Sequence, residues 1–182
     1  MAKTSMSAVF RALLARGGVI VKPGAHNALS ARIIEAAGFE SIGVSGYAVS
    51  VTLLGKPDCG LVTLDEMVMM SRYIAGAVSI PAIADADTGH GNAINVMRTV
   101  EDFIRAGVAG IHIEDQVAPK RCGHVAGKQI IPIEEAVGKY RAAAKVRDEL
   151  DPDFVLIART DARGVAGGTV ADTIERDRAY AD

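Results

Sequence analysis

The sequence predicts an α/β protein of the (β/α)8 TIM-type barrel class, of which the chain contains about the first five β/α units. Five short apolar runs, rich in Val, Ile, Ala and Leu, recur along the chain. None of these runs alternates with polar residues, which is typical of parallel strands buried on both faces. Helical patterns separate the runs, and this strict alternation of strands and helices indicates a parallel sheet.

Each strand and helix has its own local signal. The predicted strands cover residues 19–22, 41–45, 82–85, 110–114 and 154–159. The predicted helices that follow them cover residues 28–37, 63–75, 93–106, 133–149 and 170–181. Thr63 is a suitable N-cap, and Asp65 and Glu66 follow it, where acidic residues stabilise the first turn of a helix. Gly38 and Gly107 stand directly after the ends of two other helices, the usual place for a glycine.

The N-terminal segment has two readings. It carries Lys3, Arg11 and Arg16 and no acidic residue, a composition that targeting peptides share. Phe10 and Leu13, however, belong to a set of apolar residues at helical spacing. An ordinary amphipathic helix before the first strand is therefore the preferred prediction.

Composition excludes several classes of function. The chain has 20 basic and 22 acidic residues, so no basic excess favours nucleic acid or an anionic membrane as a partner. The two cysteines, Cys59 and Cys122, lack the spacing of a metal site, and so few cysteines fit the reducing cytoplasm. No apolar run approaches the roughly 20 residues that cross a bilayer.

Polar residues follow successive predicted strands, and this favours a barrel over an open doubly wound sheet. They are Ser45, Asp85, Asp87, Glu114 and Arg159. Barrel enzymes assemble their sites at the carboxyl ends of their strands. The glycine pattern of a dinucleotide site is absent after the first strand. Because a barrel needs eight strands and about 250 residues, residues 1–182 are expected to form a single barrel domain truncated at its C-terminus.

Two acidic residues end the third predicted strand. Asp85 and Asp87 are two positions apart, so their side chains point to the same face of a strand. Adjacent carboxylates repel unless a cation or a proton lies between them, and magnesium prefers oxygen ligands. Glu114 could add a third carboxylate from the neighbouring strand. The alternative is a pair of turn or capping acids, and spacing alone leaves both interpretations open.

A cysteine stands in a basic loop after the fourth strand. Residues 120–124 read KRCGH, and cationic neighbours raise the thiolate content of a cysteine. Gly123 would let this segment move as a lid, so Cys122 could act as a general acid or base. The alternative is a buried, inert cysteine, which the basic surroundings disfavour. Cys59 has no such neighbours and is predicted to be structural.

Two further strand ends could bind a carboxylate. Ser45, Gly46 and Tyr47 offer a hydroxyl group and backbone amides, although Ser-Gly turns are common. Arg159 could hold a carboxylate through two parallel hydrogen bonds, or it could form a salt bridge within the barrel mouth.

Four of these segments together resemble the isocitrate lyase/phosphoenolpyruvate mutase superfamily, in its 2-methylisocitrate and dimethylmalate lyase-like branch. They are residues 85–89 (DADTG), 112–115 (HIED), 120–124 (KRCGH) and 158–162 (ARTDA). Residues 54–58 (LGKPD) also match the family's loop after the second strand. The resemblance extends from residue 10 to the last helix, and the combination is specific although each piece is common.

The resemblance implies a cofactor and a role for each residue. Mg²⁺, for which Mn²⁺ could substitute, would be bound directly by Asp85, with Asp87, Glu114 and Asp58 holding its waters. The implied substrate-binding residues are Ser45, Gly46, Tyr47, Asp85, His112, Cys122, Gly123, His124 and Arg159. The implied catalytic residues are Cys122, the proton donor or acceptor of a gating loop, with Tyr47, Lys120, His124 and Arg159.

The implied activity is cleavage of a carbon–carbon bond in a 2-hydroxy di- or tricarboxylate such as 2-methylisocitrate. Retro-aldol chemistry would release a 2-oxo acid (pyruvate or glyoxylate) and a carboxylate such as succinate. The expected partners are a small 2-hydroxy or 2-oxo carboxylate and further copies of the chain in a homotetramer. The alternatives are phosphoryl transfer of the carboxyvinyl-carboxyphosphonate or phosphoenolpyruvate mutase type, oxaloacetate decarboxylation or hydrolysis, and an inactive barrel that serves only as a binding module.

Overall fold

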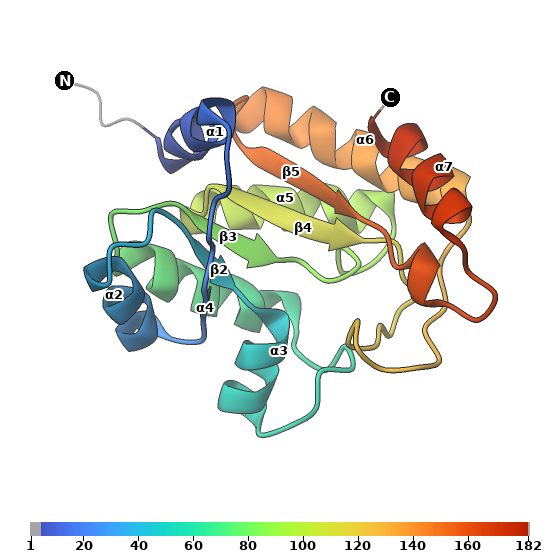
Figure 1. Cartoon of the computed structure of the whole chain (residues 1–182), viewed down its shortest axis with the longest axis horizontal. Helices are drawn as coiled ribbons and strands as arrows, with labels where there is room; N and C mark the ends of the chain where they lie inside the picture. The colour runs from blue at the N-terminus through green and yellow to red at the C-terminus, as the bar shows by residue number, and fades with distance from the viewer. Residues whose placement is uncertain (1–4, 182) are drawn as a thin grey trace.

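The computed structural model describes residues 5–181 and shows a parallel sheet flanked by helices (Figure 1). The strands are β1 (Gly24–Ala25), β2 (Ile42–Val44), β3 (Ala82–Asp85), β4 (Gly110–Glu114) and β5 (Val155–Arg159). They lie in the order β1-β2-β3-β4-β5, and every neighbouring pair is parallel. The order never reverses, whereas a doubly wound sheet reverses at its switch point. The predicted α/β class is confirmed, and the topology is that of consecutive barrel units.

All the predicted helices are present. The long ones are α1 (Met6–Arg16), α2 (Ala28–Ala36), α4 (Leu64–Gly76), α5 (Ala93–Ala106), α6 (Ile133–Leu150) and α7 (Val170–Ala181). Three short elements were not predicted: α3 (Gly46–Val49), the π-helical turn η1 (Ser50–Leu54) and the 3₁₀ turn η2 (Ala162–Gly164). The predicted cap of α4 is confirmed, because Thr63 and Glu66 each accept a hydrogen bond from the other's backbone N–H. No described helix combines the length and apolarity needed to cross a membrane.

The two faces of the sheet are covered differently. The main core lies between the sheet and helices α2, α4, α5 and α6, and it contains the fully buried Ile42, Ile111 and Phe103. On the opposite face, α1 packs Phe10 against Ile83 and Val155. These two residues lie toward the amino ends of β3 and β5. The carboxyl ends of the strands remain free of this packing, and the polar residues gather there.

The first strand was predicted too early. Residues 19–22 were expected to form it, but β1 is Gly24–Ala25. Val19 is 88% exposed and Val21 is 58% exposed, so these side chains lie outside the core. Pairing with β2 starts where Gly43 N donates to Pro23 O at 2.8 Å. Lys3, part of the possible targeting signal, lies outside the described residues.

A close approach of two strands requires glycine at position 110. A Cβ atom on Gly110 would overlap Val155 O and lie 2.9 Å from Val155 Cβ. We expect Gly110→Ala to lower the free energy of unfolding by about 1–3 kcal/mol, because β4 and β5 must separate. Gly138→Ala is the matched control: it lies in α6 with no atom within 4 Å of the added carbon, and we expect it to stabilise the chain. Urea unfolding of both variants measures the difference, and equal effects would contradict this packing.

Candidate active site

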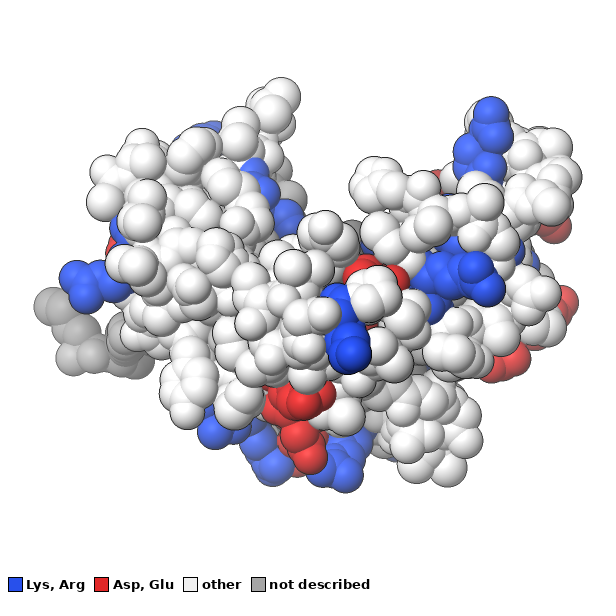
Figure 2. Space-filling view, turned by 90° about the horizontal axis from the view of Figure 1, so that it is seen from below, with Lys and Arg blue, Asp and Glu red and all other residues white. Residues whose placement is uncertain are grey.

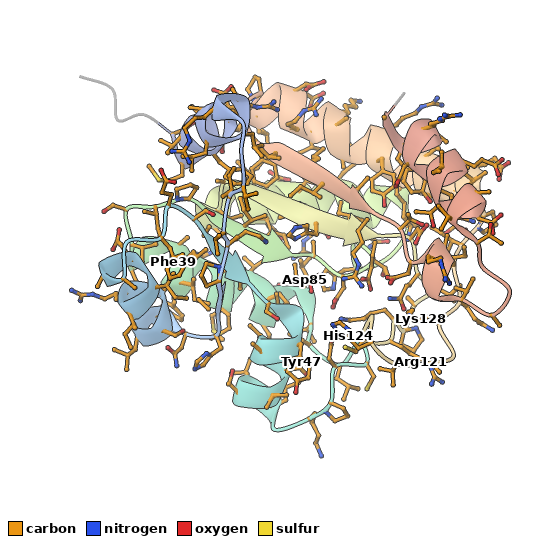
Figure 3. All side chains as sticks on the ribbon, viewed as in Figure 1. Phe39, Tyr47, Asp85, Arg121, His124 and Lys128 are labelled. Carbon is orange, nitrogen blue, oxygen red and sulfur yellow. The ribbon has the colours of Figure 1, made fainter. Side chains whose placement is uncertain are left out.

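A cavity of about 550 Å³ opens at the carboxyl edge of the sheet. Its lining residues are Ser45, Tyr47, Asp58, Asp85, Lys120, Cys122, Gly123, His124 and Arg159. All of them belong to the set predicted from the sequence, although they come from five separate segments. Figure 3 shows Asp85 at the end of β3, with Tyr47 on α3 and His124 on the loop after β4 on the same side. A second cavity, of about 350 Å³, adjoins it and adds His112 to Ser45, Asp85 and Arg159.

Strand pairing brings the charged residues together. Asp85 lies beside His112 in the register of β3 and β4, and Glu114 lies beside Arg159 in that of β4 and β5. Arg159 Nη1 is 3.1 Å from Glu114 Oε2. One edge of the sheet therefore presents carboxylates and a guanidinium group side by side.

The backbone turns sharply after β3 and keeps two carboxylates close. Asp87 has a positive φ of 47°, which an aspartate tolerates better than most residues. Its N–H donates to Asp85 Oδ1 at 3.0 Å. Gly46 approaches both side chains, since an added Cβ would lie 2.8 Å from Asp85 Oδ2 and 3.5 Å from Asp87 Oδ1. The turn and the glycine together aim two acidic groups at one small volume.

Burial makes these carboxylates difficult to ionise. It raises the pKa of Asp87 to about 6, with a further contribution from the charge of Asp85. It also raises the pKa of Glu114 to about 8, although Arg159 opposes the shift. Glu114 Oε1 has no hydrogen-bond partner among residues 5–181. Lys120 Nζ lies 2.8 Å from Asp87 Oδ1, but this oxygen also makes no well-aligned hydrogen bond within the described chain.

A divalent cation fits this donor set. Buried carboxylate oxygens without a partner are costly, and a bound cation would offset that cost. Within the described residues, no three His, Cys, Asp or Glu side chains are close enough to hold a metal directly. The four predicted metal residues, Asp85, Asp87, Glu114 and Asp58, thus do not form one direct ligand cluster. Magnesium keeps several waters and needs only one or two carboxylates, and this arrangement is the one that the residues fit.

Lys120, which was predicted to belong to a mobile catalytic loop, is buried between two acidic residues. Its side chain is only 5% exposed, and Nζ lies 2.6 Å from Asp58 Oδ1 and 2.8 Å from Asp87 Oδ1. Burial alone would lower the pKa of Lys120, but the charges of Asp87 and Asp85 outweigh it and raise that pKa. Lys120 therefore anchors the loop to the acidic turn, and Asp58, predicted as a metal residue, is its ion-pair partner.

The loop that carries Cys122 folds back over the cavity. Cys122 N donates to Asp58 O at 3.1 Å. Lys128, which is buried, donates to Gly123 O at 2.6 Å and to Val125 O at 3.1 Å. Cys122 itself is a free, half-buried thiol. Cys122 thus lines the cavity from a loop that is held at several points.

The remaining predicted residues lie around the rim and the floor. Tyr47 is 56% exposed at the start of α3, and His124 is exposed on the loop. His112 lies deeper, where burial and the positive charge of Lys22 lower its pKa to about 4. Its imidazole is therefore neutral at neutral pH. Lys22 lines the second cavity and was missed, because a lysine before a short strand carries no distinctive sequence signal.

The charge on the surrounding surface is dispersed. Figure 2, which shows one face of the molecule, has blue and red side chains scattered over a largely white surface that is hollowed between two lobes. The charges that matter at the site are therefore local ones, contributed by the residues at the strand ends.

Comparison with known proteins decides the family. The sequence matches the family model described as phosphoenolpyruvate phosphomutase over residues 10–182. The chain belongs to this family. It is 48% identical over 174 residues to the 2,3-dimethylmalate lyase of Eubacterium barkeri, covering 96% of the chain and 59% of that protein. It is 49% identical over 174 residues to the chloroplastic carboxyvinyl-carboxyphosphonate phosphorylmutase of Arabidopsis thaliana, covering 94% of the chain and 50% of that protein.

Solved structures of the family have the same fold. A crystal structure of 2,3-dimethylmalate lyase, a member of the PEP mutase/isocitrate lyase superfamily, superposes with a TM-score of 0.93 at 40% identity. The superposition covers 99% of this chain and 60% of the chain in that crystal structure. A phosphonopyruvate hydrolase in complex with oxalate and Mg²⁺ superposes with a TM-score of 0.88 at 38% identity, covering 98% and 60%. The chain thus spans about half to three-fifths of the length of these relatives. The predicted superfamily is confirmed.

Glu114 makes metal-free stability depend on pH. Its pKa is raised to about 8 in the folded chain, so it stabilises the fold while protonated, and this stability is lost as the pH rises from its unfolded value through 8. Each unit of the shift corresponds to about 1.4 kcal/mol. We expect metal-free Glu114→Gln to gain stability relative to the wild type between about pH 5 and pH 8.5, measured by urea unfolding. A difference that stays constant across this range would contradict the raised pKa.

Proposed function

We propose that this chain carries the magnesium-dependent part of the active site of a carbon–carbon lyase. The lyase would act on 2-hydroxy di- or tricarboxylates. One observation supports this more than any other: Cys122, Asp85 and Arg159 line the same cavity of about 550 Å³. A thiol, a carboxylate and a guanidinium group around one volume of this size suit a small anionic substrate. The name of the relative from Eubacterium barkeri, 2,3-dimethylmalate lyase, supports the same reaction class.

Arg159 is the group that would bind the substrate carboxylate. Its guanidinium group pairs with Glu114 on one side, through Nη1, and with Asp161 on the other, through Nη2 at 3.1 Å. These two pairs fix the plane of the guanidinium group toward the cavity. Ser45, at the end of β2, adds a hydroxyl group at the same rim. The substrate would thus be held by an oriented cation rather than by a flexible one.

Magnesium, bound at Asp85 with Asp87 and Glu114 around it, would polarise the substrate oxygen and offset its developing negative charge. The relative solved with oxalate and Mg²⁺ supports this assignment. The protein residues do the rest: they exclude water, orient the oxo acid through Arg159, and keep uncompensated carboxylates ready for the cation.

Cys122 would complete the reaction. When the carbon–carbon bond breaks, a carboxylate at the strand ends would accept the hydroxyl proton, the 2-oxo acid forms, and the bonding electron pair remains on the carbon next to the other carboxylate. That carbon needs a proton, and the thiol of Cys122 can donate it from the loop above the cavity. This step gives the neutral C–H bond of the released carboxylate product. A proton donor at this position favours cleavage over phosphoryl transfer, which needs no such proton.

A substrate screen tests the proposal. The chain is incubated with Mg²⁺ and either 2-methylisocitrate, 2,3-dimethylmalate, isocitrate, oxaloacetate or phosphonopyruvate, and release of pyruvate or glyoxylate is followed. We expect release from a 2-hydroxy di- or tricarboxylate, and we expect EDTA to abolish it. Release of pyruvate from phosphonopyruvate alone would favour hydrolysis of the phosphorus–carbon bond, and conversion of phosphonopyruvate to phosphoenolpyruvate without pyruvate release would favour the mutase class. No release, together with no stabilisation by Mg²⁺, would favour a binding module. The homotetramer and the cytoplasmic location stay predictions.

A further inference from the structure

A buried amide side chain links the loop that carries Cys122 to Arg159. Gln116, just after β4, is 1% exposed. Its Nε2 donates to Arg121 O at 3.0 Å, and its Oε1 accepts from Arg121 N at 2.9 Å. Both backbone groups of Arg121, the residue before Cys122, are therefore satisfied by one side chain. The amide replaces a strand partner at the stem of the loop.

The same amide reaches the other side of the site. Gln116 Nε2 also donates to Asp161 Oδ2 at 2.8 Å. Asp161 in turn accepts from Arg159 Nη2 at 3.2 Å and 3.1 Å through its two oxygens. The path from the thiol loop to the guanidinium group thus runs through two side chains, Gln116 and Asp161, which are both buried.

Both ends of this path are held in place. The N–H of Asp161 donates to Asp115 Oδ1 at 2.9 Å, which holds the backbone from which its carboxylate extends. Gly123, one residue after Cys122, lies so close to Arg159 that an added Cβ would be 2.5 Å from Nη2. The thiol loop and the guanidinium group therefore share a fixed separation, and a buried amide with all its partners is a rigid connector.

We propose that Gln116 is a positioning residue, which fixes the stem of the Cys122 loop relative to Arg159 through Asp161. The thiol of Cys122 and the guanidinium group of Arg159 can then contact the same bound oxo acid. This inference rests on the proposed function, because it assumes that the anion lies between these two groups. Loss of the amide leaves Arg121 N–H and Arg121 C=O without a partner and leaves Asp161 with Arg159 alone, and the loop then samples open positions.

The reactivity of the Cys122 thiol measures this positioning without needing turnover. The background is Cys59→Ser, so that Cys122 is the one remaining cysteine of the sequence. Alkylation by iodoacetamide is followed by intact mass, with and without Mg²⁺ plus oxalate. Gln116→Leu is compared with Gln129→Leu, a control on the exposed residue whose backbone pairs with Val117 nearby.

We expect Gln116→Leu to raise the alkylation rate about fivefold or more, the factor that one lost buried hydrogen bond gives in a local opening equilibrium. Mg²⁺ with oxalate should slow alkylation in the parent and in Gln129→Leu, but no longer in Gln116→Leu. The Mg²⁺ concentration that gives half of the maximal rise in unfolding temperature should not change, because Gln116 does not contact Asp85 or Asp87. A purely structural role would instead move this midpoint as well.

Besides a shift of the Mg²⁺ midpoint, three outcomes would overturn the proposal. The first is an unchanged rate and unchanged protection in folded Gln116→Leu, and the second is an equal rise in Gln129→Leu. The third is loss of the native circular dichroism in both Gln116→Leu and the volume-matched Gln116→Met, which would show that Gln116 supports the whole fold. If Mg²⁺ and oxalate fail to protect the parent itself, the proposed function fails, while the ligand-free rates still decide the role of Gln116.

Discussion

Asp85→Asn is expected to weaken Mg²⁺ binding by about 100-fold or more, because even residues that only support a metal ligand contribute tenfold to 100-fold. Asp85 lines both cavities at the sheet edge, and the bare Gly46 gives its carboxylate room. The substitution keeps the shape of the side chain and removes the charge that the cation needs. Thermal unfolding at increasing Mg²⁺ concentration measures the loss, since a ligand of the folded state raises the midpoint temperature.

Asp65→Asn is the matched control for this change. Asp65 has an 88% exposed side chain on α4, and its Oδ1 lies 3.9 Å from Arg98 Nη2. We expect its Mg²⁺ response to equal that of the wild type. Mg²⁺ stabilisation that survives in Asp85→Asn would remove Asp85 from the metal site.

Cys122→Ser is expected to lower turnover by about 100-fold to 10,000-fold, the range that a positioned general acid contributes. A serine hydroxyl group is a far weaker acid than a thiol, although it occupies nearly the same space. Mg²⁺ and oxalate should bind as in the wild type, because the proposed role of Cys122 is proton donation and not metal binding. Initial rates with the best substrate of the screen give the measurement.

Cys59→Ser separates the catalytic thiol from thiols in general. Cys59 shares a neighbouring cavity with Cys122 but does not line the cavity that contains Asp85 and Arg159. Its Sγ contacts only Pro57 O, at 3.6 Å, among the hydrogen bonds of the described chain. We expect its turnover to stay within about twofold of the wild type, as for most surface changes. Equal rates for Cys122→Ser and the wild type would exclude proton transfer by Cys122.

The fold was predictable because its strands are buried on both faces and its helices carry ordinary start and stop signals. Segments such as Ala82–Asp85, which is apolar up to its last residue, are typical of a covered parallel sheet. The first strand was misplaced because Val19 and Val21 have the apolar character of a strand but lie exposed. The composition of a segment does not indicate where strand pairing begins, and here the pairing with β2 begins only at Pro23.

The site was predictable in membership but not in detail. Strand ends in a parallel sheet meet at one edge, so Asp85, Glu114 and Arg159 had to be neighbours. The burial of Lys120 was not predictable, because its partners Asp58 and Asp87 come from other segments. Gln116 was missed for the same reason: an amide after a strand is unremarkable until the backbone groups of Arg121 are placed around it.

Calorimetric titration of the chain with oxalate, in the presence and absence of Mg²⁺, tests most directly whether the acidic strand ends hold an oxo acid through a divalent cation. Oxalate binding that requires Mg²⁺ and disappears in Asp85→Asn is the predicted result. Oxalate binding of equal strength without the cation, or in Asp85→Asn, would contradict it.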